Sequence, residues 1–309
     1  MIVITPQQEK IIRALGHYKY LGVSQLSKAG CGFIEKMRQN VRKLRDLGVI
    51  DTIRFGGFGN HSKAEDMHFL TLKGARLLLE YDTMLSLPDI KFPKQTTSVF
   101  FNDYWHRHTF LDTQIAYQNW IATQEDCHPL FFDRYFDKFG NNRTPSPGVS
   151  GSVGMSDHLS GDGETSDDEP GSSKKTIKSA TYMELSDGSH YSPDGLFAYE
   201  KSSGKKFLYL LEVYRGKDTQ RTFSQLLKGL QATSEGVPSQ KYSYTVANRI
   251  LATFEHEGNL EAVRTRLRKD PWARTAEKFI FFGVDEVIQR HFPTGWRDIS
   301  GKEVDLGGF

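Results

Sequence analysis

The chain has 309 residues, of which 38% are hydrophobic, 25% charged and 12% aromatic, and its formal net charge is +2. This length favours two domains over one small module, and the sequence has no apolar run long enough for a membrane span. The first residues, MIVITPQQEK, lack the basic and apolar regions of a secretory signal. The only two cysteines, Cys31 and Cys127, exclude a disulfide framework and a thiolate zinc site. We therefore expect a cytoplasmic protein.

Charge is distributed unevenly along the chain. Residues 1–80 contain 13 Lys and Arg against seven Asp and Glu, whereas residues 141–176 contain three basic and six acidic residues. The second segment also holds six Gly, eight Ser and three Pro, and no aromatic residue. Such a composition cannot bury enough apolar surface to offset the entropy lost on ordering. We predict that residues 141–176 form a disordered acidic Gly/Ser insertion.

Residues 1–90 have the pattern of a winged helix-turn-helix domain. Thr5, Pro6 and Gln8 predict a helix start, with a capping box and a proline at the first helical position. The following pattern predicts a short helix over 23–28, a helix over 33–47, strands over 49–55 and 67–71, and a helix over 72–81. Three helices joined to a two-stranded ribbon are typical of the winged variant.

The helix over 33–47 is the expected DNA-recognition element. Its polar positions include Arg38, Gln39, Arg42 and Lys43, and Arg54 lies in the strand that follows. We expect these five side chains to bind double-stranded DNA, through phosphates and base edges that the same residue types can contact. The alternative is that they form an ordinary solvated face.

A second long helix is predicted from Asp103 to about Thr123. His106 and His108 resemble the paired metal-binding histidines of tyrosine relaxases, but helical periodicity sends the two to different faces, which argues against that motif. His108 and Asp112 lie four residues apart beside the apolar stripe. Either His108 is a buried structural histidine or the two belong to a site.

The remaining sequence predicts a mixed α/β sheet. Strands are expected over 182–185, 193–199, 207–214, 242–247 and 278–283, with helices over 219–233 and 258–269. Such alternation is typical of a sheet with helices packed on its faces.

Two acids in these strands are the main catalytic candidates. Asp194 follows Pro193 at a strand start, and Glu212 lies inside the most apolar strand, FLYLLEVY. A buried carboxylate is costly unless it is paired or bound to a cation. The intervening turn allows both acids to meet at one sheet end, where adjacent carboxylates suit Mg²⁺ or Mn²⁺. The alternative is a structural turn aspartate and an ion-paired glutamate.

The arrangement of Pro193-Asp194 and Glu212-Val213-Tyr214 within an αβββαβ order resembles the PD-(D/E)xK nuclease core. In that core the last motif residue is usually lysine, where this chain has Tyr214. The resemblance implies that a lysine from the next helix replaces it, with Lys228 as the candidate and Lys217 as a less constrained one.

With the winged helix and the segments HRHTFLDTQIA and LEVYRGKDTQRTFSQLLKGLQ, the chain resembles the replication-relaxation family, in particular MobC-type plasmid mobilisation relaxases. The resemblance implies a winged helix over 1–90 and a nuclease-like domain over 98–309. It also implies a protein that nicks one strand at a plasmid origin of transfer, together with other relaxosome proteins and a coupling protein.

The same resemblance implies the roles of individual residues. Asp194, Glu212 and the carbonyl of Val213 would bind the metal, Lys228 would stabilise the phosphate, and His108 and Asp112 would be further site residues. Tyr214 would be either a packing residue or a nucleophile. The rival hypothesis is a catalytically degenerate DNA-binding accessory protein or replication regulator. A defence nuclease that cuts both strands is a further alternative.

Overall fold

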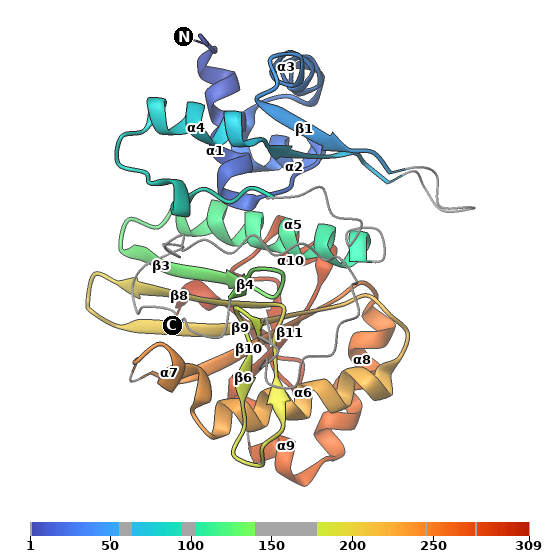
Figure 1. Cartoon of the computed structure of the whole chain (residues 1–309). Coiled ribbons are helices and arrows are strands. Elements are labelled where there is room, and N and C mark those ends of the chain that lie inside the picture. Colours follow the sequence, from blue (N-terminus) through green and yellow to red (C-terminus); the bar gives the residue numbers. More distant parts are fainter. Residues whose placement is uncertain are drawn as a thin grey trace, which may run out of the picture.

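The computed structural model describes residues 2–55, 64–93, 103–139, 178–244, 246–275 and 277–308. These residues form a mixed α/β structure, which confirms the predicted class (Figure 1). The insertion expected over 141–176 lies outside the described residues and stays a prediction.

The amino-terminal elements follow the expected order. They are α1 (Pro6–Tyr18), α2 (Val23–Leu26), a π turn η1 (Ser27–Cys31), α3 (Ile34–Asp46), β1 (Ile50–Ile53), β2 (Met67–Leu70), α4 (Leu72–Tyr81) and η2 (Leu87–Asp89). The predicted capping box is present, because Thr5 accepts from the amide of Gln8 and the Gln8 side chain accepts from the amide of Thr5. Strands β1 and β2 pair antiparallel.

The larger sheet has the strand order β13-β12-β11-β10-β9-β8-β3. Its strands are β3 (Cys127–Arg134), β8 (Gly195–Lys201), β9 (Lys206–Tyr214), β10 (Asn248–Phe254), β11 (Ile280–Val284), β12 (Trp296–Arg297) and β13 (Glu303–Val304). Strands β9, β10 and β11 run parallel, whereas β8 is antiparallel to both of its neighbours.

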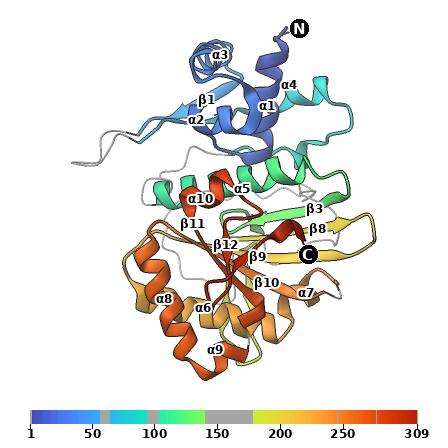
Figure 2. The same ribbon diagram turned by 180° about the vertical axis from the view of Figure 1, so that it is seen from behind.

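Helices cover both faces of this sheet. They are α5 (Tyr104–Ile121), α6 (Thr219–Ser234), α7 (Val237–Lys241), α8 (Glu257–Lys269), α9 (Pro271–Thr275) and α10 (Asp285–Arg290). Helices α5 and α10 pack on one face, and α6 and α8 on the other (Figures 1 and 2). Short elements complete the described chain: β4 (Lys138–Phe139), β5 (Lys178–Ser179), β6 (Met183–Glu184), β7 (His190–Tyr191), η4 (Glu277–Phe279) and η5 (Leu306–Gly308).

Strand β9 is buried on both faces because it lies between these two helical layers. Tyr209 and Leu211 pack into the core beneath α5, and Leu208 and Leu210 pack into the core beneath α6. The near-continuous apolar run in this strand follows from that position.

Two strand predictions are wrong. The described residues of the segment 242–247 form no strand: Tyr242 stacks on Phe131 with ring centroids 4.1 Å apart, and the strand begins only at Asn248. The aromatic residues of this segment therefore contribute to packing without forming a strand. Segment 182–185 contributes β6 to a separate two-stranded ribbon with β7 instead of joining the large sheet.

The sheet strand that precedes β8 is β3, which the sequence pattern did not predict. It contains Pro129, and its pairing with β8 shifts register between Pro129 and Phe131. Proline and a bulge are tolerated because β3 is the edge strand. Both features break the alternation by which strands are recognised.

The amino-terminal elements rest on α5 (Figure 1). Asp112 of α5 accepts hydrogen bonds from the Gln25 side chain at 3.0 Å and from Lys28 at 2.6 Å. The buried Arg134 guanidinium donates to the carbonyl of Tyr18 at 3.0 Å. Helix α5 thus contacts both the amino-terminal elements and the sheet. None of the helices in the described ranges is long and apolar enough to cross a membrane.

Candidate active site

Asp194 and Glu212 meet at one end of the hairpin formed by β8 and β9. Gly195 pairs with Leu211 in this hairpin, so the residues that follow Leu211 and precede Gly195 are neighbours. The same end of the sheet holds the carboxyl ends of the parallel strands β9, β10 and β11. Ligands of open α/β sheets bind preferentially at this end of the strands.

The carboxylate of Asp194 is held from two elements. Its Oδ1 lies 2.9 Å from Nε2 of His106 on α5, and its Oδ2 accepts a hydrogen bond from the amide of Val213 at 2.8 Å. The carbonyl of Asp194 also accepts from the amide of Tyr135. These contacts fix the orientation of the carboxylate, and they engage Val213 through its amide. The predicted metal contact of the Val213 carbonyl stays a prediction.

His106 is the site histidine that the sequence analysis missed. Burial lowers the pKa of His106, but the charge of Asp194 and the contact with it have the larger combined effect, and the pKa is raised above 6.5. The two histidines do lie on different faces of α5, as predicted, yet it is His106 rather than His108 that reaches the acid pair. The sequence argued against the strand-based histidine motif, but which face of α5 meets Asp194 depends on tertiary packing that the sequence pattern does not reveal.

Glu212 is buried beneath α6. The hydroxyl of Tyr191 donates to its Oε1, and a β-carbon at Gly229 of α6 would lie 2.7 Å from that hydroxyl, so glycine permits the close approach. Burial, and then the negative charge of Asp194, raise the pKa of Glu212 well above 4.5. No cation pairs with Glu212 among the residues that the structure describes. The carboxylate is therefore placed where a bound cation would stabilise its charge.

Tyr214 lies on the same side of β9 as Glu212, which is the position the motif lysine would take. Its hydroxyl is buried, and its ring packs 5.2 Å from that of Phe254. Burial, then the charges of Glu212 and Asp194, raise the pKa of Tyr214 well above 10. A hydroxyl that is this hard to ionise is a poor nucleophile, so these surroundings favour the packing interpretation.

Asp285 is a third acid at this end of the sheet, and it was not predicted. It follows β11 directly, is buried, and its Oδ1 has no hydrogen-bond partner in the described part of the chain. Burial raises its pKa to about 6, against the opposing effects of a hydrogen bond from Thr253 and of the nearby positive charges of Arg215 and His106. Its position directly after an apolar strand was the signal available in the sequence.

Arg215 supplies the positive charge at the end of β9. It forms an ion pair with Glu255 at 2.7 Å, and its guanidinium lies 5.4 Å from the ring centroid of Trp105 on α5. Arg215 is therefore the cationic residue closest in sequence to Glu212, whereas the position of the motif lysine holds Tyr214.

Lys228 lies on α6 beside the buried face of that helix. The buried residues of α6 are Thr222, Leu226, Gly229, Leu230, Ala232 and Thr233, and helical geometry places Lys228 to the side of them. Within the described ranges, no hydrogen bond or ion pair joins its ammonium to either acid. Lys217 is exposed in the loop before α6. The role of Lys228 that the resemblance implies stays a prediction, and Gly229 is the α6 residue that faces Tyr191.

His108 and Asp112 also lie away from the acid pair. His108 lies 4.0 Å from Glu65 and 3.7 Å from Asp112, and Asp112 binds Gln25 and Lys28. These contacts belong to the interface between α5 and the amino-terminal elements. The structure therefore favours an interface role over a catalytic one for both residues.

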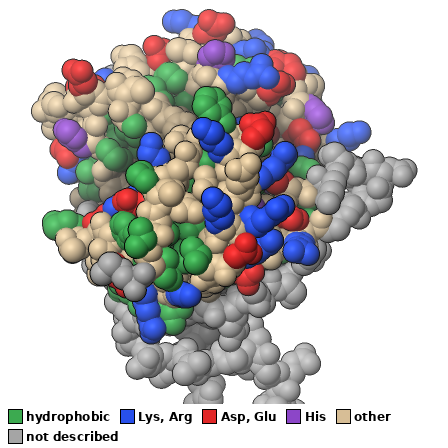
Figure 3. All heavy atoms as spheres, turned by 90° about the horizontal axis from the view of Figure 1, so that it is seen from above, with side chains coloured by type: hydrophobic (Ala, Val, Ile, Leu, Met, Phe, Trp, Pro, Cys, Tyr) green, Lys and Arg blue, Asp and Glu red, His purple; other side chains and the backbone are tan. Residues whose placement is uncertain are grey.

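The predicted DNA contacts are all exposed. Arg38, Gln39, Arg42 and Lys43 lie on the solvent side of α3, and Arg54 lies just beyond β1. A hollow of about 450 Å³ beside α3 is lined by the basic residues Arg38, Arg42 and Arg45 and by Glu65, Asp66 and His68. Figure 3, which views this end of the molecule, shows Lys and Arg side chains spread over the face with acidic side chains between them.

A hard cation fits the residues present. The described residues hold no group of three or more His, Cys, Asp and Glu side chains arranged to bind a metal. However, Mg²⁺ is commonly bound through one or two carboxylates, with water and substrate phosphate completing its shell. Two adjacent carboxylates, one of which is buried without a cation, meet that requirement.

Comparisons with known proteins add no evidence about the fold or the site. No protein-family model matches the chain, and no curated protein matches its sequence.

Proposed function

We propose that the chain is a metal-dependent DNA nicking endonuclease, of the kind used in plasmid mobilisation, which binds double-stranded DNA through its amino-terminal winged helix. The observation that carries this proposal is the meeting of Asp194 and Glu212 at one sheet end, with Glu212 buried and lacking a cation partner in the described part of the chain. A buried carboxylate beside a second, partly buried one is expensive to keep for structure alone.

The element order supports the nuclease assignment. Apart from the short elements β4 to β7 and α7, the succession α5, β3, β8, β9, α6 and β10 gives the αβββαβ order of the PD-(D/E)xK core, with Asp194 directly before β8 and Glu212 on the adjacent strand β9. The succession from α1 to α4 with the β1–β2 ribbon supports a winged helix. A plasmid origin of transfer as the target, and relaxosome and coupling proteins as partners, follow from this proposal.

The roles of the residues follow from their positions. Asp194 and Glu212 would hold Mg²⁺ or Mn²⁺, which when bound supplies positive charge to a scissile phosphate and lowers the pKa of water. His106 and the amide of Val213 orient Asp194, and Tyr191 orients Glu212. Arg215 lies at the end of β9, where it can attract the DNA phosphate.

A plasmid-nicking assay tests the proposal. Purified protein with Mg²⁺ or Mn²⁺ should convert a supercoiled plasmid bearing its origin to the open circular form, and a chelator should stop the reaction. Asp194→Ala and Glu212→Ala should each abolish nicking while leaving duplex binding intact. Full activity in either variant would overturn the assignment.

The same assay separates the two roles of Tyr214. If water cleaves the strand, no protein–DNA adduct forms, and Tyr214→Phe still nicks. If Tyr214 is the nucleophile, a denaturing gel shows an adduct that Tyr214→Phe lacks. The buried hydroxyl with its raised pKa supports the first outcome.

A second candidate function is origin-specific DNA binding without cleavage. It is favoured by Tyr214 at the motif position of lysine and by the lack, within the described ranges, of a hydrogen bond or ion pair between Lys228 and either acid. On this hypothesis, the protein binds duplex DNA in a salt-sensitive way, and Arg38→Gln/Arg42→Gln weakens that binding. No cleavage is seen with any divalent metal.

A further inference from the structure

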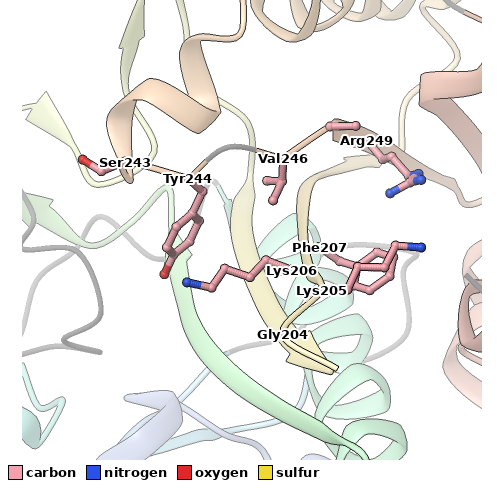
Figure 4. A pocket seen from close by; sticks show the side chains of 9 residues that line it. Gly204, Lys205, Lys206, Phe207, Ser243, Tyr244, Val246 and Arg249 are labelled. Atoms are coloured by element: carbon pink, nitrogen blue, oxygen red, sulfur yellow. The ribbon is translucent and has the colours of Figure 1, made fainter. Parts of the chain in front are cut away.

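A cavity lies at the other end of the large sheet from the acid pair. About 490 Å³ in volume, it is lined by the turn between β8 and β9, by the start of β9 and by the segment leading into β10 (Figure 4). Since Lys206 and Glu212 lie six residues apart on one strand, the cavity and the acid pair are separated by roughly 20 Å. We call this cavity the hairpin pocket; it is lined by Gly204, Lys205, Lys206, Phe207, Ser243, Tyr244, Val246, Ala247 and Arg249.

Positive charge is concentrated around the aromatic residues of the hairpin pocket. The ammonium of Lys205 lies 4.9 Å from the ring centroid of Phe207, and that of Lys206 lies 4.9 Å from the ring centroid of Tyr244. The guanidinium of Arg249 lies 5.8 Å from the Phe207 ring. Figure 4 shows the Lys206 side chain directed toward Tyr244, and Lys205 and Arg249 gathered near Phe207.

Little negative charge in the described residues compensates the two lysines locally. Glu200 lies opposite Lys206 in the strand register of the hairpin, and its charge, after burial, contributes to the raised pKa of Tyr244. Within the described ranges, the ammonium groups of Lys205 and Lys206 make neither a hydrogen bond nor an ion pair. Like charges held this close around a cavity repel each other unless an anion binds between them.

The volume and the side chains of the hairpin pocket indicate which class of ligand it could bind. Lysine and arginine side chains bind phosphate through charge-assisted hydrogen bonds, and the half-buried ring of Tyr244 offers an apolar surface beside them. Single-stranded nucleic acids are bound by this combination of basic groove and aromatic ring. The cavity has the volume of a small-ligand site, which suits a nucleotide of a single strand better than a double helix.

We propose that the hairpin pocket binds a phosphate and the adjoining base of a single DNA strand. The choice of DNA rests on the proposed function, whereas the anion site itself rests on the cavity and its lysines. In a nicking enzyme, such a site would hold the strand at a distance from the cleavage centre, through contacts independent of the metal.

Binding of a short fluorescent oligothymidine to the full chain tests this proposal. Lys205→Gln/Lys206→Gln should weaken binding at least about tenfold and make the dependence on salt shallower by roughly one to two counterions. The matched control is Lys269→Gln/Lys278→Gln, which removes two exposed lysines elsewhere, one of them also near an aromatic ring. Equal affinity of the pocket variant and the wild type, or an equal loss in the control, would overturn the proposal.

Two further measurements identify the ligand. Inorganic phosphate and thymidine monophosphate should displace the oligonucleotide only at far higher concentration than an unlabelled strand does. Displacement by either at the same concentration as the strand would instead make the pocket a site for small phosphates and overturn the strand assignment.

The final arm separates this proposal from the proposed function. Asp194→Asn should abolish nicking without changing oligothymidine binding, and Arg38→Gln/Arg42→Gln should weaken duplex binding more than single-strand binding. If nicking is never observed but the pocket variant still weakens single-strand binding, the nuclease proposal fails and the hairpin pocket stands. If nicking occurs and the pocket variant binds normally, the hairpin pocket fails alone.

Discussion

The imidazole Nε2 of His106 lies 2.9 Å from Oδ1 of Asp194 and joins α5 to the end of the β8–β9 hairpin. The other carboxylate oxygen accepts from the amide of Val213, so Asp194 cannot rotate without breaking one of the two contacts. Partners of this kind orient metal-binding carboxylates and tune their affinity. His106 is accordingly a positioning residue for Asp194.

His106→Ala should raise the Mg²⁺ concentration needed for half-maximal nicking by roughly tenfold or more, because Asp194 loses one of the contacts that orient it. His106→Gln, which keeps an N–H donor, should recover part of the loss. His108→Ala is the matched control on the other face of α5 and should leave the Mg²⁺ requirement unchanged. A purely structural role for His106 would lower the melting temperature in both His106 variants without moving the metal titration.

Tyr191→Phe removes the hydroxyl that donates to the buried Glu212. Losing that partner should destabilise the fold by roughly 1–3 kcal/mol, measured by urea unfolding, and should also impair nicking. Tyr242→Phe is a close control, since the hydroxyl of the buried Tyr242 donates to a carboxylate, that of Asp133, in a partly buried contact. Tyr242→Phe should lower the free energy of unfolding by a similar amount but leave nicking per folded molecule unchanged. Normal nicking in Tyr191→Phe would show that this contact only supports packing.

Local sequence rules predicted most of the elements because they depend on neighbouring residues. The capping residue Thr5, the apolar spacing of α3 and the continuous apolar run of β9 each specify one element without reference to the rest of the chain. The adjacency of Asp194 and Glu212 was also predictable, since a single short hairpin joins their strands.

Other features depend on contacts distant in sequence and could not be predicted in this way. The contact of His106 with Asp194 spans 88 residues, and which face of α5 meets the hairpin is set by the packing of the whole sheet. The edge position that tolerates Pro129 in β3 has the same origin. Likewise, the resemblance implied Lys228 as the site lysine, but which α6 residue faces Tyr191 depends on how the helix packs, and that residue is Gly229.

Asp285 should make the stability of the protein depend on pH in a specific direction. Its pKa is raised from 3.8 to about 6, so the fold favours the protonated form. The stabilisation from holding this proton is fully present below about pH 4 and is lost as the pH rises through about 6. Asp285→Asn, which stays neutral, should therefore be more stable than the wild type above pH 6, by on the order of 2 kcal/mol, and equal to it in acid.

Asp298→Asn should change the pH dependence of stability in the opposite direction to Asp285→Asn. Although burial alone would raise the pKa of Asp298, hydrogen bonds from Ser300, Lys302 and Gly301 lower it below 3.8. Its stabilisation is present above the unfolded pKa and is lost as the pH falls, so the variant should be less stable at neutral pH and approach the wild type in acid. Unfolding curves across pH that moved both variants in the same direction would contradict these assignments.

Asp112→Ala distinguishes an interface role from the catalytic one suggested by the sequence. The change leaves the buried amide of Gln25 without its carboxylate acceptor and removes the partner of Lys28. Such losses cost roughly 1–3 kcal/mol, so the unfolding midpoint should fall while nicking per folded molecule stays normal. The control Glu286→Ala breaks an exposed ion pair with Arg290 and should cost less than about 0.5 kcal/mol. Loss of nicking at an unchanged unfolding midpoint would instead place Asp112 in the catalytic machinery, because a residue that only joins α5 to the amino-terminal elements acts through stability.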